Sequence, residues 1–210
     1  LDLTWCADST GPRTPNEEHI ELTQMREDRP EILETDVPFW SLMKALLIDP
    51  MNQELIKQVE ETAATTTATT WLKISTKDKD KDCTPLLLLM IVLYKNSESE
   101  DLIKASQHAA AIAQPKTWSK VQKESGYTPF LYLIVTLSRN LGSEDLITAA
   151  QKVAEKTEPE VWNSTTANDI LVQGPLWHLM KTLPDHVENK ALMNLAQQAI
   201  EKALPAAWDN

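Results

Sequence analysis

The chain has 210 residues, of which 42% are hydrophobic and 24% charged, and its formal net charge is −11 at pH 7. This negative charge argues against nucleic acids and anionic membranes as partners, because both repel an acidic protein. Every apolar run is shorter than the roughly 18 residues that a membrane-spanning helix needs, so we predict a soluble protein without a membrane span.

Residues 1–37 are predicted to form an acidic N-terminal arm. They contain ten acidic and three basic residues, which gives them a net charge of −7. The apolar residues Ile20, Leu22 and Met25 are compatible with a short helix in this arm, and Pro30 would end it. We expect the arm to face a basic surface on a partner protein.

A repeated unit occupies the rest of the chain. Four prolines each have a tryptophan 33 residues later, and the units differ in length only between a tryptophan and the next proline. The prolines are Pro38, Pro85, Pro129 and Pro175, and the tryptophans are Trp71, Trp118, Trp162 and Trp208. Repeats that vary only in their connectors are typical of stacked solenoid units. We therefore predict one repeat domain over residues 38–210, with units at 38–71, 85–118, 129–162 and 175–208.

The first part of each unit predicts an amphipathic helix, here called helix A. Counted from the proline as offset 0, offsets 4 and 8 are leucine in all four units, and offsets 1 and 5 are always apolar. Residues at these offsets share one face of a helix with 3.6 residues per turn. Proline suits the first helical turn, where its missing amide would have no partner, and Thr84 and Thr128 precede two of these prolines as predicted N-caps.

The second part of each unit predicts another helix, helix B. Offset 14 is a capping residue in every unit, namely Asn52, Ser99, Ser143 and Asn189. Small residues, mostly alanine, continue the apolar stripe of helix B, so a neighbouring helix is able to approach closely. We expect helix B to end before the proline at offset 30, which is Pro115, Pro159 or Pro205. The P-x-x-W sequence that follows predicts a short helical turn whose tryptophan ring fills the junction between helices.

These patterns predict an all-α fold, a solenoid-like stack of four helix-turn-helix repeats with short third helical turns that carry the tryptophans. At offset 6 the inner units have Ile91 and Val135, whereas the outer units have Lys44 and Lys181. We therefore expect the inner A helices to be buried between neighbours and the outer units to act as caps of a complete stack.

Offsets 2, 3 and 6 of helix A vary between units, and recognition residues in solenoids lie at variable positions on a constant framework. The predicted partner contacts are Trp40, Ser41, Lys44, Tyr132, Trp177, His178 and Lys181. For the two tryptophans at offset 2, packing over the ends of the stack is an alternative to anchoring a partner. If these residues bind a partner, Trp177→Ala or Tyr132→Ala weakens binding and leaves thermal stability nearly unchanged.

Residues with chemistry are sparse. Cys6 and Cys83 form neither a metal pattern nor a disulfide framework, so we expect a reducing, cytosolic environment, and the sequence leaves their pairing open. The four histidines lack zinc-binding spacing. The alternating Asp and Lys residues at 78–82 lack the glycine and glutamate of a calcium loop. With four glycines the chain has no phosphate-binding loop, so we expect no metal, no cofactor and no enzymatic activity.

Two unit openings, GYTPF at 126–130 and DCTPL at 82–86, resemble the G-x-T-P-L opening of ankyrin repeats. The likeness covers the four units, but their period of 44–47 residues is longer than that of ankyrin repeats, and the P-x-x-W turn is foreign to that family. Diverged arrays of this kind look like effector proteins that intracellular bacteria secrete. The resemblance implies a protein-binding module without catalysis, located in the host cytosol if the protein is secreted.

We therefore predict a non-catalytic protein–protein interaction scaffold, with a bacterial effector or effector-regulating module as its setting. The partner would be another protein. The alternative is a docking or regulatory region of a larger enzyme whose active part lies outside this chain. The sequence also leaves open the oligomeric state, including a repeat that serves only to assemble copies of itself.

Overall fold

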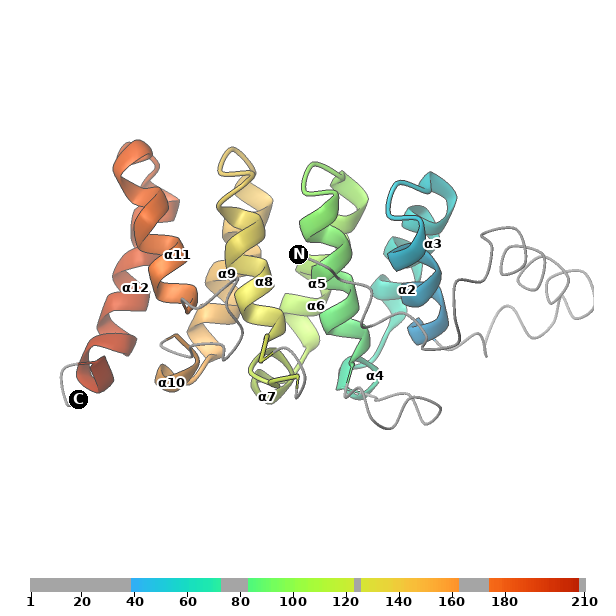
Figure 1. The fold of residues 1–210 in the computed structure, drawn as a ribbon, viewed down its shortest axis with the longest axis horizontal. Helices are drawn as coiled ribbons and strands as arrows, with labels where there is room; N and C mark the ends of the chain where they lie inside the picture. Colours follow the sequence, from blue (N-terminus) through green and yellow to red (C-terminus); the bar gives the residue numbers. More distant parts are fainter. Residues whose placement is uncertain (1–38, 73–82, 123–125, 163–173, 208–210) are drawn as a thin grey trace, which may run out of the picture.

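The computed structural model describes residues 39–72, 83–122, 126–162 and 174–207, and the described residues are helical without strands (Figure 1). The predicted all-α class is therefore confirmed for this part of the chain. The acidic arm, Pro38, the Asp and Lys residues at 78–82, and Trp208 lie outside the described residues.

Each predicted unit contributes two principal helices. The A helices are α2 (Phe39–Ile48), α5 (Pro85–Lys95), α8 (Pro129–Leu137) and α11 (Pro175–Thr182), the last followed by the short 3-10 helix η3 (Leu183–Asp185). The B helices are α3 (Gln53–Thr65), α6 (Glu100–Ile112), α9 (Glu144–Lys156) and α12 (Lys190–Ala207). Three short helices, α4 (Ala68–Leu72), α7 (Pro115–Trp118) and α10 (Pro159–Trp162), contain the predicted P-x-x-W turns and the corresponding turn of the first unit.

The helix pairs lie side by side in a row (Figure 1). Each A helix contacts the next A helix along the row, and each B helix contacts the next B helix. The A helices are on the near side in Figure 1, the turns between A and B lie along the upper edge, and the short helices lie along the lower edge. One long side of the row is therefore built from A helices alone.

The predicted capping residues make the hydrogen bonds that define the helix starts. At the four B helices, the backbone N–H three residues after the cap donates to the side-chain oxygen of Asn52, Ser99, Ser143 or Asn189 at 3.0–3.4 Å. Thr84 and Thr128 accept in the same way at the starts of α5 and α8, at 3.2 and 3.1 Å. These contacts satisfy amides that the first helical turn leaves without a partner.

Burial follows the predicted difference between inner and outer units. All residues from Pro85 to Leu93 in α5 and from Pro129 to Leu137 in α8 are buried. Only four residues of α2 and two of α11 are buried. Each inner A helix has a neighbouring A helix on both flanks and a B helix behind it, which buries more of its surface than in the outer units.

The tryptophans of the short helices are core residues. Trp71, Trp118 and Trp162 are all fully buried. Phe39 meets the ring of Trp71 edge-on at 4.8 Å, and Phe130 meets the ring of Trp162 in the same way at 4.7 Å, so each ring packs on helix A of its own unit. The short helices α4 and α10 also contact α5 and α11 of the following units. These three rings therefore belong to the buried core of the described residues.

The prediction that helix B ends before the proline is wrong in the fourth unit. Helix α12 continues through Pro205 to Ala207, whereas α6 and α9 end before Pro115 and Pro159. A break at this point allows the short helix to turn toward the A helix of the next unit. In α12 the helical backbone continues through the proline instead.

Hydrogen bonds between neighbouring units recur at equal offsets. The side-chain amides of Asn96 and Asn140, both at offset 11, donate to the carbonyls of Pro50 and Ser97 in the preceding unit at 3.3 and 2.8 Å. The side-chain amides of Gln107 and Gln151, both at offset 22, donate to offset 16 of the following unit. Gln107 donates to the carboxylate of Asp145 at 2.8 Å, and Gln151 donates to the backbone carbonyl of Ala191 at 2.9 Å. Each inner junction thus has polar contacts in one fixed register.

Lysines at offset 27 bind the ends of the preceding B helices. The amine of Lys156 donates to two carbonyls at the end of α6 at 3.2 Å, and that of Lys202 donates to two carbonyls at the end of α9 at 2.7 Å. A cation is favourable there because the last carbonyls of a helix carry partial negative charge. In the second unit this offset is occupied by Ile112, which is 40% exposed.

Exchanging residues at offset 27 is expected to change stability in both directions. Lys156→Met should lower the free energy of unfolding by about 1 kcal/mol, because it removes charge-assisted hydrogen bonds between units. Ile112→Lys should raise it by roughly 0.5–1 kcal/mol, because the new amine would meet the last carbonyls of α3. Urea unfolding followed by circular dichroism measures both changes. If Ile112→Lys lowers the free energy of unfolding, a lysine at this offset does not bind the end of α3 between the first and second units.

Candidate functional site

Charge is distributed unequally between the two kinds of helix. The four A helices contain no Asp or Glu, and three of them contain a lysine. Every B helix contains at least one Glu. The side of the row formed by the A helices and pointing away from the B helices is here called the A-helix face. Its aromatic and basic residues are Trp40, Lys44, Tyr94, Lys95, Arg139, Trp177, His178 and Lys181. This face is therefore locally basic in a chain whose net charge is −11.

Three of its basic groups lie over aromatic rings. In the first and last units the amines of Lys44 and Lys181 are 4.3 and 4.9 Å from the ring centres of Trp40 and Trp177, at the same offsets of 6 and 2. Such contacts orient a cation while leaving part of its charge accessible to an anionic group.

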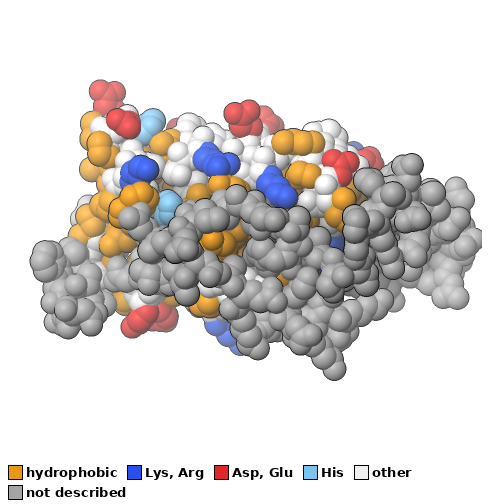
Figure 2. Space-filling view, viewed as in Figure 1, with side chains coloured by type: hydrophobic (Ala, Val, Ile, Leu, Met, Phe, Trp, Pro, Cys, Tyr) orange, Lys and Arg blue, Asp and Glu red, His pale blue; other side chains and the backbone are white. Residues whose placement is uncertain are grey.

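The third pair joins two units. The guanidinium carbon of Arg139 is 3.7 Å from the ring centre of Tyr94, and Arg139 also donates to the hydroxyl and the backbone carbonyl of Tyr94. Figure 2 shows the resulting pattern: Lys and Arg side chains are spaced along this side of the molecule with hydrophobic side chains beside them, and acidic side chains gather mainly along the upper edge.

Tyr132, one of the predicted contact residues, is part of the core. Its side chain is 0% exposed and packs edge-on against Tyr94 and Tyr127, with ring centres 5.9 and 5.6 Å apart. The expectation that Tyr132→Ala leaves stability unchanged is therefore wrong. Helix α8 has helices on both flanks, and the ring at offset 3 fills the space beside Tyr94 from the preceding unit.

The two tryptophans at offset 2 differ in exposure. The indole N–H of Trp40 donates to the carbonyl of Cys83, two residues before the second unit, at 3.5 Å, and the ring is half-buried against the core. Trp177 is 40% exposed. Ser41 is half-buried on α2. Trp40 is thus tied to the segment before α5, whereas the ring of Trp177 is partly accessible at the other end of the row.

His178 lies beside Trp177 and Lys181 at the α11 end of the A-helix face. Its ring meets that of Trp177 edge-on at 5.0 Å, and its Nε2 atom is buried without a hydrogen-bond partner. Burial lowers the pKa of His178, and the positive charge of Lys181 lowers this pKa further. The imidazole is therefore neutral in the folded protein near pH 7, so it adds no charge to the face there.

The lowered pKa of His178 makes stability dependent on pH. Because the unfolded state takes up a proton at this residue more readily than the folded state, the free energy of unfolding falls as the pH drops through the ordinary histidine range. His178→Gln should remove this contribution, so the variant should lose less stability than the parent between about pH 7.5 and 5.5. Thermal unfolding at both pH values measures the difference. An equal loss in both proteins would assign the pH dependence to other groups.

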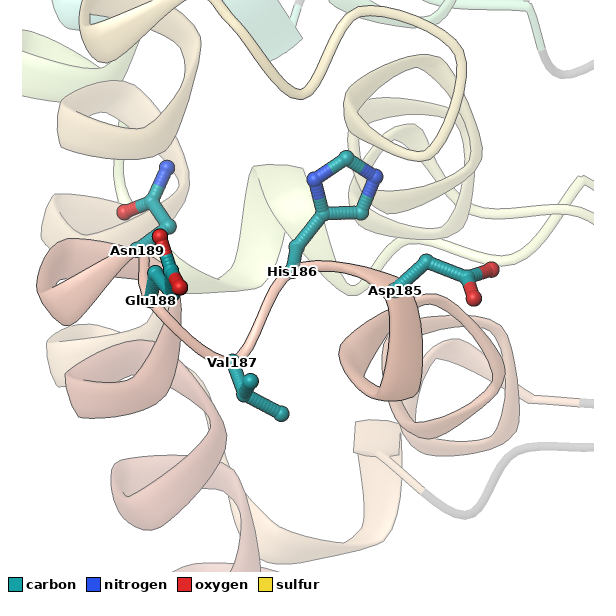
Figure 3. Close-up of a pocket in the computed structure, with 5 residues that line it drawn as sticks. All are labelled: Asp185, His186, Val187, Glu188 and Asn189. Carbon is teal, nitrogen blue, oxygen red and sulfur yellow. The ribbon is translucent and has the colours of Figure 1, made fainter.

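A separate hollow of about 340 Å³ lies at the turn between η3 and α12 and is lined by Asp185, His186, Val187, Glu188 and Asn189. Figure 3 shows the side chains of Asp185, His186 and Val187 pointing in different directions rather than toward a common point. Asn189 is engaged in capping α12. These five consecutive residues form an open turn and do not assemble a nucleophile, base or anion site.

The A-helix face brings cations and aromatic rings together on one side of the described residues. Within the described ranges, no group of three or more His, Cys, Asp or Glu side chains is placed to hold a metal ion. No helix in the same ranges is long and apolar enough to cross a membrane.

Tyr94, Lys95 and Arg139 were missed in the sequence because they lie beyond the offsets chosen for recognition. The absence of Asp and Glu from offsets 0–9 of all four units was the available signal. Comparisons of the chain with protein-family models, with curated proteins and with solved structures found no match.

Proposed function

We propose that this protein is a non-catalytic protein–protein interaction scaffold, a solenoid-like stack of four helical units whose A-helix face binds an acidic, partly apolar segment of another protein. The resemblance of the unit openings to ankyrin repeats is compatible with this function, because such arrays bind proteins. An effector or effector-regulating role is one setting for it.

The main support for the proposal is that the B helices contain acidic residues whereas the A helices contain none. The described A helices have no Asp or Glu, and cations lie over Trp40, Tyr94 and Trp177, so this face offers both an electrostatic and an apolar contact to a ligand. Acidic groups of a partner would meet the cations, and its apolar side chains would meet the rings. Aromatic residues beside basic ones are also the commonest anchors of binding energy in protein interfaces.

Peptide selection followed by charge reversal tests this function. A random peptide library displayed on phage is selected against the full chain, and the most enriched peptide is synthesised with a fluorophore for anisotropy titration. We expect the enriched peptides to contain Asp or Glu together with apolar residues. The variant Lys44→Glu, Lys95→Glu, Lys181→Glu should bind the peptide at least about tenfold more weakly, since each cation contributes about 0.5–1 kcal/mol.

The chain supplies a matched control on its opposite side. Lys57, Lys104 and Lys152 lie exposed on the B helices α3, α6 and α9. Reversing these three charges changes the net charge of the protein by the same amount and should leave peptide binding nearly unchanged. If both triple variants bind the peptide equally weakly, the loss of affinity comes from the change in net charge and not from the A-helix face. Failure to enrich any peptide, or enrichment without acidic residues, would count against the proposed face.

A further inference from the structure

The A-helix face combines aromatic rings with cations. Trp40 and Trp177 lie under the amines of Lys44 and Lys181, and the ring of Tyr94 lies under a guanidinium. The ring of Trp177 is 40% exposed, and those of Trp40 and Tyr94 are half-buried. Such pairs offer both an apolar and an electrostatic contact to a segment of opposite charge.

The chain contains a segment whose charge is opposite to that of this face. Residues 1–38 carry ten acidic and three basic side chains, and they include the apolar residues Ile20, Leu22 and Met25. The A helices carry cations and no carboxylates. Attraction between an acidic segment and a basic face on one molecule is strengthened by the high effective concentration that a covalent connection gives.

The connection and the length of the segment also fit. Residue 38 joins directly to Phe39 at the start of α2, the first A helix of the row. Neighbouring packed helices are about 8–10 Å apart, so the four A helices extend over roughly 30 Å. An extended chain covers this distance with about nine residues. A segment of 38 residues is therefore long enough to cross the whole face.

We propose that the acidic N-terminal segment, residues 1–38, occupies the A-helix face of its own chain and is the ligand that a partner protein must displace. This inference rests on the proposed function, since it assigns the regulation of the same face. It also identifies a basic counterpart for the acidic arm within the same molecule. The cations of the A-helix face would meet the segment's carboxylates, and the aromatic rings beside them would meet its apolar side chains.

Zero-length cross-linking of the full chain tests the proposal. A water-soluble carbodiimide couples a carboxylate to a lysine amine, with loss of water, only where the two groups are in contact. The monomer is isolated after coupling at low protein concentration, digested and analysed by mass spectrometry. We expect carboxylates of residues 1–37 to couple to Lys44, Lys95 and Lys181 about fivefold or more above their coupling to Lys57, Lys104 and Lys152, and high salt to reduce this preference. Equal coupling to the two sets of lysines, or none to the first set, would overturn the proposal.

A second measurement separates this inference from the proposed function. In the full chain, Glu17, Glu18, Glu21, Glu27 and Glu31 are replaced together by Gln, and the selected fluorescent peptide is titrated again. Removing an intramolecular competitor should tighten peptide binding about tenfold. Unchanged peptide affinity would overturn the competition between segment and partner while leaving the proposed function intact. Coupling to the A-helix lysines without any selected peptide would support occupation of the face and contradict the partner-binding function.

Discussion

Replacing Trp118 with alanine is expected to lower the free energy of unfolding by about 3–5 kcal/mol, the range observed when large buried aromatic side chains are truncated. Trp118 is fully buried on α7, which contacts both α8 and α9 of the following unit. The lost ring therefore opens a cavity at the centre of the row. For a chain of this length the midpoint of thermal unfolding should fall by roughly 6–20 °C, measured by circular dichroism.

Trp118→Phe provides the matched comparison. The indole N–H of Trp118 makes no hydrogen bond within the described residues, so phenylalanine gives up ring volume without leaving a broken polar contact. The free energy of unfolding should fall in Trp118→Phe by roughly half as much as in Trp118→Ala. A loss of stability as large as that of Trp118→Ala would indicate that the N–H has a partner that stabilises the fold.

Tyr132→Ala should destabilise the protein by about 3 kcal/mol or more, because the ring is fully buried and edge-on to two other tyrosine rings. The effect should appear at the junction between the second and third units, since Tyr94 belongs to the second. Hydrogen exchange would locate it as loss of amide protection in α5 and α8.

Trp177→Ala is the control for this prediction on the same face. Trp177 is 40% exposed and lies on the last A helix, so its removal should cost about 1 kcal/mol or less. Binding of the selected peptide should weaken in this variant, as expected for an exposed aromatic anchor. The pair of variants thus distinguishes a core residue from a contact residue at neighbouring offsets. Equal losses of stability would place Trp177 in the core as well.

The helical elements were largely predictable because their signals are local. Proline at offset 0, a capping residue at offset 14 and leucine at offsets 4 and 8 act within one or two helical turns, and they determine where helices A and B begin and which side is buried. The helix end that was predicted wrongly lies at Pro205. The prolines at 115, 159 and 205 share offset 30, so the local pattern does not distinguish the helix that continues from the two that end.

The candidate site was less predictable because its contacts join different units. Tyr94 and Arg139 are 45 residues apart, and their contact depends on how α5 and α8 lie beside each other. Tyr132 is variable in the sequence pattern, and its burial depends on Tyr94 and Tyr127 from other segments. Periodicity within a unit identifies an outward-pointing offset but does not reveal what the neighbouring unit places over it.

The polar contacts between the described units have a direction. Asparagine at offset 11 and lysine at offset 27 both donate to the preceding unit. The first unit has Asp49 and Thr65 at these offsets, and the carboxylate of Asp49 accepts a hydrogen bond from Asn52 in its own turn. Removing a donor at either offset from a later unit should therefore loosen its junction with the unit before it and leave the following junction intact.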